Sequence, residues 1–141
     1  MANFESQLIA LIDSANEICG AAEKSGRSNE FDGSEWAHVA HAHLGGQPPQ
    51  PDLEAERQLA EVLISAATEG MVSAAHDLSD GGLAQAVVEM CLRGNRGATL
   101  NLSGDAFTGL WSESVARAVV AVTSEQVAGV LALAQQHGVP A

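Results

Sequence analysis

Four polar side chains that could bind a metal–phosphate group lie within five positions near the middle of the chain: His76, Asp77, Ser79 and Asp80. Gly81 and Gly82 follow directly, and glycines allow a backbone to turn or to approach a ligand closely. Carboxylate oxygens suit a hard cation such as Mg²⁺, and the N–H groups at a helix start suit phosphate. This segment therefore has the residue types of a loop that binds magnesium-bound phosphate.

The flanking residues predict a strand before this loop and a helix after it. Residues 71–75 form a short apolar run, and apolar residues recur at helical spacing over 83–92. A strand, glycine turn and helix would place the polar residues at the positive end of the helix dipole. A structural alternative stays open, in which Ser79 or Asp80 is an ordinary N-cap and the glycines form a simple turn.

The remaining patterns predict an α/β (α+β) fold with a mixed sheet of about three to four strands flanked by helices. Helices are expected at 4–22, 34–43, 53–69, 105–113 and 125–136, and further strands at 98–102 and 118–122. N-caps are expected at Asn3, Ser34, Asp52 and Ser124. Side chains expected to face inward are Trp36, Val39, Ala40, Leu59, Val62, Leu63 and Ala66.

Composition excludes several classes of function. The chain has 141 residues, with 18 acidic and 6 Lys or Arg side chains and a formal net charge of −12, so nucleic acid is not an expected partner. Its apolar runs are too short to span a membrane. Cys19 and Cys91 do not make a disulfide framework. We expect a cytoplasmic domain with reduced thiols.

Three histidines, His38, His41 and His43, resemble a metal cluster at first sight. Helical spacing puts the first two on one face. No nearby cysteine or carboxylate completes a zinc set, so surface histidines are the preferred interpretation.

The segment HDLSDGGLAQAVVEM resembles the HDxSDGGL segment of the phosphoribosylformylglycinamidine synthase large-subunit family, within the aminoimidazole ribonucleotide synthetase superfamily. Three other blocks are similar to that family and come in its order: FDGSEWA at 31–37, LGGQPPQPDLEAE at 44–56 and LWSESVARAVVAV at 110–122. The resemblance implies a C-terminal domain of this superfamily over residues 30–141, truncated at its end. Residues 1–29 are expected to be a helix and linker that do not match the family.

The resemblance also implies roles for individual residues. Asp77 would be a ligand of Mg²⁺ bound to ATP or ADP, and Ser79 would contact the nucleotide. Gly81 and Gly82 would give close backbone approach. His76 and Asp80 would orient the loop. Glu113 and Ser114 match a substrate-contacting E-S-Q element, but Val115 replaces its glutamine, which weakens that assignment.

The activity implied is that of an ATP-dependent, glutamine-using ligase of purine biosynthesis, which converts formylglycinamide ribonucleotide to formylglycinamidine ribonucleotide. Implied partners are the remaining domains of the large subunit, a glutaminase and small accessory subunits, with a homodimer as a further option. No catalytic acid or base is assigned to this chain, and we expect it to have little turnover alone. Two alternatives stay open: another enzyme of the superfamily, and a non-catalytic module that docks partner domains.

Overall fold

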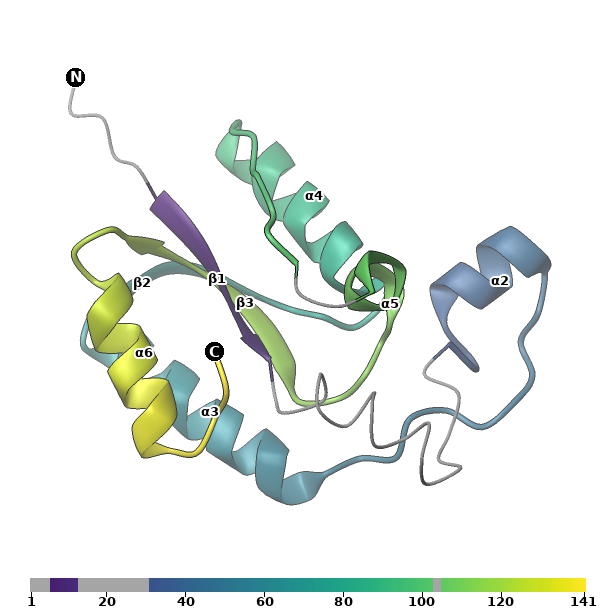
Figure 1. Cartoon of the computed structure of the whole chain (residues 1–141), viewed down its shortest axis with the longest axis horizontal. Helices are drawn as coiled ribbons and strands as arrows, with labels where there is room; N and C mark the ends of the chain where they lie inside the picture. The colour runs from purple at the N-terminus through teal and green to yellow at the C-terminus, as the bar shows by residue number, and fades with distance from the viewer. Residues whose placement is uncertain (1–5, 13–30, 103–104) are drawn as a thin grey trace. The chain divides into compact units, whose positions relative to one another are not determined.

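A computed structural model describes residues 6–12, 31–102 and 105–141 (Figure 1). The chain forms two compact units. We call residues 1–14, 52–77 and 116–141 the sheet unit, and residues 15–51 and 78–115 the helical unit. The polypeptide passes from the first unit to the second between Asp77 and Leu78, inside the polar loop.

The sheet unit contains three strands, β1 (Ser6–Ile12), β2 (Val72–Asp77) and β3 (Arg117–Thr123), among the described residues. Their order is β1-β3-β2, and both neighbours run antiparallel to β3. The α/β class is confirmed, whereas the described strands form an antiparallel sheet and not the mixed sheet that was predicted. The β-branched run of β3 is buried along most of its length, as expected of a central strand.

Helices α3 (Leu53–Thr68) and α6 (Val127–Gln136) of this unit pack against each other (Figure 1). Together with β3 they enclose a core of Leu59, Val62, Ala118, Val120, Val122, Val130, Ala134 and Val139. Asp52 caps α3, because its carboxylate accepts hydrogen bonds from the N–H groups of Glu54 and Ala55. The predicted buried stripe of α3 is confirmed.

The helical unit contains α2 (Glu35–His41), α4 (Gly82–Gly94) and α5 (Ala106–Trp111). Ser34 caps α2 as predicted, with its hydroxyl accepting from the N–H of Ala37 at 3.1 Å. The α4 and α5 helices contact each other. The Trp36 ring lies 5.5 Å from the Phe31 ring and 5.0 Å from the Phe107 ring, centroid to centroid, which joins α2 to α5 through an aromatic cluster.

Three predicted elements are wrong. Ser6–Ile12 is a strand where a helix over 4–22 was predicted, because a short apolar run fits both periods and its pairing with β3 decides. Residues 98–102 form no strand, and Leu100 is 36% exposed. The last helix begins at Val127, after a turn, so Ser124 is not its cap.

Two inward-facing assignments in α2 are also wrong. Val39 is 78% exposed and Ala40 is exposed, while Ala37 is the buried residue of this short helix. The predicted cap at Asn3, the remainder of the predicted 4–22 helix and the linker before residue 30 lie outside the described residues.

Asp105 gives a prediction about pH. Its carboxylate accepts hydrogen bonds from the hydroxyl and the N–H of Thr108, and these bonds lower the pKa of Asp105. A lowered folded-state pKa means that the stabilisation is present above the unfolded pKa and is lost as pH falls through the folded value. We therefore expect Asp105→Ala to lower the Tm at pH 7 and to have less effect at a pH below the ordinary aspartate pKa of about 3.9.

Thermal unfolding at pH 7 and at pH 3 measures this difference. Glu69→Ala removes an exposed carboxylate elsewhere and is the matched control. An Asp105→Ala effect on Tm that is equal at the two pH values would contradict the capping role.

Candidate functional site

The predicted strand, polar loop and helix are all present. Strand β2 ends at Asp77, Leu78 is buried at 2% exposure, and α4 begins at Gly82. A register shift between Val72 and Ala74 places a bulge at Ser73, whose hydroxyl donates to the carbonyl of Ala121 at 3.0 Å. A bulge re-aims the residues that follow it, so it helps to set the direction of the strand end.

Asp77 lies at the exposed end of β2. Its side chain is 71% exposed, and that of His76 is 27% exposed. The Nδ1 atom of His76 lies 3.4 Å from Oδ1 of Asp77 and 2.7 Å from the Asp77 carbonyl oxygen. The Asp77 carboxylate is therefore accessible to a cation from solvent, and His76 fixes the backbone beside it.

The two glycines serve the packing of the chain itself. Gly81 is the N-cap of α4 with φ of +75°, and Gly82 has φ of +61°, a region that favours glycine. A Cβ on Gly82 would lie 2.6 Å from the Ser112 carbonyl oxygen and 2.7 Å from that of Leu110. Close approach at Gly82 is thus to the end of α5.

Glu113 ties the starts of two helices together. Its Oε1 atom accepts hydrogen bonds from the N–H groups of Glu35 and Gly81, each at 2.8 Å. A carboxylate near helix N-termini is favoured by both hydrogen bonding and the helix dipole. This contact stabilises the glycine turn, and it occupies one donor that the motif would otherwise offer to a phosphate.

The other predicted residues lie around this turn. Ser79 and Asp80 are exposed, and the Ser79 carbonyl accepts from the N–H of Gly82 at 2.9 Å. Neither side chain caps α4, because its N-cap is Gly81 without a side-chain bond. Ser114 is half-buried, two residues before Ala116 returns to the sheet unit.

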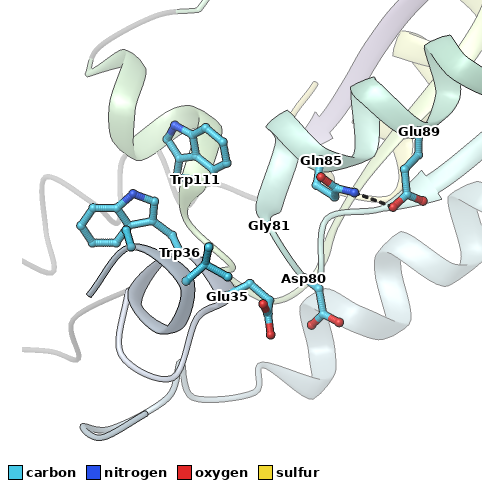
Figure 2. Close-up of a pocket in the computed structure, with 9 residues that line it drawn as sticks. Glu35, Trp36, Asp80, Gly81, Gln85, Glu89 and Trp111 are labelled. Atoms are coloured by element: carbon cyan, nitrogen blue, oxygen red, sulfur yellow. Dashed lines mark hydrogen bonds between the residues drawn. The ribbon is translucent and has the colours of Figure 1, made fainter. Parts of the chain in front are cut away.

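A cleft of about 550 Å³ lies within the helical unit (Figure 2). It is lined by Glu35, Trp36, Val39, Ala40, Asp80, Gly81, Gln85, Glu89 and Trp111. Of the predicted site residues, Asp80 and Gly81 reach this cleft, while the others do not line it. Figure 2 shows the two tryptophans on one side and the hydrogen-bonded Gln85–Glu89 pair of α4 on another.

Sequence reasoning missed most of this cleft. Trp36, Glu89 and Trp111 lie on three different helices, and no local spacing connects them. It also missed the bridging contact of Glu113, for the same reason. The sequence feature that could have indicated the cleft was its two tryptophans. Tryptophan combines a large apolar ring with a polar N–H group and is enriched at interfaces.

Two further expectations concern metals and membranes. His38, His41 and His43 are exposed, and no group of three His, Cys, Asp or Glu residues in the described part of the chain could hold a metal ion. Among residues 6–12, 31–102 and 105–141, no helix is long and apolar enough to cross a membrane.

Comparison with known proteins places these features in a family. The family described as AIR synthase related protein, C-terminal domain, matches residues 9–141. This match begins upstream of the first motif at 31–37. Phosphoribosylformylglycinamidine synthase subunit PurL of a Nocardioides species is 58% identical over 110 residues, covering 78% of this chain and 14% of that subunit. The chain thus spans about a seventh of that relative's length.

Solved structures show the same likeness. The T. maritima PurL complexed with ATP is 28% identical, with a TM-score of 0.56 over 64% of this chain and 17% of that one. PurLQS from Thermotoga maritima has a TM-score of 0.62 over 97% of this chain and 21% of that one, and its 20% identity supports the fold alone. The fold, the ordered motifs and these matches agree. This chain belongs to the family of AIR synthase related protein C-terminal domains.

Proposed function

We propose that this chain is part of a phosphoribosylformylglycinamidine synthase-type ligase and that its loop 76–82 contributes to binding an Mg-nucleotide, ATP or ADP. The observation that carries the proposal is the accessible carboxylate of Asp77 at the strand end, directly before the glycine turn into α4. The Nocardioides subunit and the ATP-complexed structure support an activity of the phosphoribosylformylglycinamidine synthase type.

Asp77 would supply one carboxylate ligand to Mg²⁺. Mg²⁺ is usually held by one or two carboxylates, with phosphate and water completing its octahedron, so a single exposed aspartate fits such an ion. Ser79, also exposed, would donate its hydroxyl to a phosphate oxygen. His76 and Asp80 would orient the loop, and Gly81 and Gly82 would keep its backbone close to the ligand.

Titration calorimetry with Mg-ATP tests the loop. We expect binding to the full chain, and we expect Asp77→Asn to weaken it by about tenfold or more, since even a hydrogen bond to a charged group contributes roughly 1.5–3 kcal/mol. Glu69→Gln is the matched control, since it removes one exposed charge from the end of α3. Equal binding by wild type and Asp77→Asn would exclude a metal-ligand role for Asp77 in this chain.

A second candidate function has one specific observation in its favour. The N–H of Gly81, a donor expected to face phosphate, is hydrogen-bonded to Glu113 within the chain. A non-catalytic module that docks other domains of a longer ligase would need no phosphate there. Mg-ATP binding to neither wild type nor variant would favour this docking role.

Further parts of the proposal concern the whole ligase. Its reaction would be the glutamine- and ATP-dependent conversion of formylglycinamide ribonucleotide to formylglycinamidine ribonucleotide, in the cytoplasm. The other large-subunit domains, a glutaminase and small accessory subunits would be its partners. Glu113 and Ser114 would contact substrate. Because Oε1 of Glu113 already accepts from the N–H groups of Glu35 and Gly81, the rest of the Glu113 side chain would have to make that contact. Formation of product by the purified chain alone would contradict dependence on those partners.

A further inference from the structure

We propose that the cleft of the helical unit binds an arginine side chain carried by another polypeptide segment. The cleft combines indole surface from Trp36 and Trp111 with three carboxylates, Glu35, Asp80 and Glu89. None of the lysine or arginine side chains in the described part of the chain lines it. Asp77 and Ser79, the proposed contacts of metal and phosphate, do not line this cleft, whereas Asp80 and Gly81 of the same loop do.

Charge decides the class of ligand. Three carboxylates around one cleft repel a phosphate or carboxylate and attract a cation. The Asp80 carboxylate makes no hydrogen bond or ion pair with any described residue. The Glu35 side chain is 50% exposed, and its Oε1 atom lies 3.7 Å from Nδ1 of exposed His38, so it can still accept from a ligand. Because no three ligands in the described chain converge on a metal position, an organic cation fits better than a bare metal ion.

The tryptophans favour a guanidinium over an ammonium group. A cation over an indole face is attracted by the ring quadrupole, and the planar guanidinium also stacks on the ring. The edge of the guanidinium can donate two parallel hydrogen bonds to one carboxylate. Trp36 is held in place by the Phe31 and Phe107 rings, so this wall of the cleft is ordered before a ligand arrives.

A polypeptide is the source of arginine that the observations favour. In the relatives a domain of this kind is a small part of a much longer chain, 14% of it in the Nocardioides subunit, so polypeptide surrounds such a domain there. The net charge of −12 also favours basic partner segments. The cleft would anchor such a segment through one arginine and leave the loop at Asp77 open.

The two tryptophans make a direct test possible, because the chain has only these two and both line the cleft. We would titrate the full chain with N-acetyl-argininamide and follow the two indole N–H resonances by NMR. N-acetyl-citrullinamide is the neutral probe of the same shape, and N-acetyl-lysinamide is the ammonium probe. We expect saturable shifts of both indole signals with the arginine probe and weaker binding of the other two.

Single substitutions test whether the Asp80 carboxylate binds the arginine probe. We expect Asp80→Asn to raise the dissociation constant of the arginine probe about two- to fivefold, the effect of one exposed ion pair. Glu69→Gln, which removes an equal charge from the sheet unit, should change it by much less. The proposal is overturned by no saturable shift, by equal binding of the citrulline or lysine probe, or by equal weakening in the two variants. None of these outcomes depends on Mg-ATP binding, so this proposal and the proposed function can fail separately.

Discussion

Replacement of Gly82 by alanine is expected to unfold the helical unit at far lower urea concentration than wild type. Gly82 has φ of +61°, and its missing Cβ would lie 2.6 Å from the Ser112 carbonyl oxygen. The left-handed conformation costs alanine about 1–2 kcal/mol. Overpacking of a close contact costs roughly another 1–3 kcal/mol. The neighbouring atom is backbone, so it cannot rotate away as a flexible side chain could.

Urea unfolding followed by tryptophan fluorescence measures this effect, because Trp36 and Trp111 both belong to the helical unit. Gly94→Ala is the matched control on the same helix. Nothing lies within 4 Å of a Cβ at Gly94, and the residue is the last of α4. We expect the control to leave stability unchanged or to raise it by up to about 1 kcal/mol. Equal stability of the Gly82→Ala and Gly94→Ala proteins would show that the contact with α5 is not tight.

The sequence was sufficient to predict the parts of this fold that depend on local chemistry. Asp52 and Ser34 cap their helices because each side chain bonds to N–H groups two or three residues later. The buried stripe of α3 follows from helical spacing, and the central place of β3 follows from its β-branched residues. Such features are fixed within a few residues of the chain.

Features that depend on distant residues could not be predicted in this way. Ser6–Ile12 became a strand because it pairs with β3, more than a hundred positions away in the sequence. The glycine turn was identified correctly, but its closest neighbour is the carbonyl of Ser112 and its acceptor is Glu113. Local periodicity contains no information about either contact. The glycines are therefore explained by packing before any ligand is considered.

Replacement of Glu113 by alanine is the second large effect that we expect. Its Oε1 atom accepts from two N–H groups, those of Glu35 and Gly81, which begin α2 and precede α4. Loss of this acceptor leaves a part-buried donor at Gly81 without its partner, at a cost of about 1–3 kcal/mol. Glu113→Gln keeps an amide oxygen as acceptor but loses the charge, so we expect it to lose less than half as much stability.

Hydrogen exchange locates the effect as well as its size. In Glu113→Ala the amides of Gly81 and Glu35 should exchange faster than in wild type, because each loses the acceptor that protects it. Glu69→Ala is the control, since Glu69 is an exposed residue at the end of α3 and its loss should change stability by no more than about 0.5 kcal/mol. If Glu113→Ala and Glu69→Ala lowered stability equally and the two amides kept their protection, Glu113 would not hold the turn. A role in contacting substrate would then become the better explanation of its position.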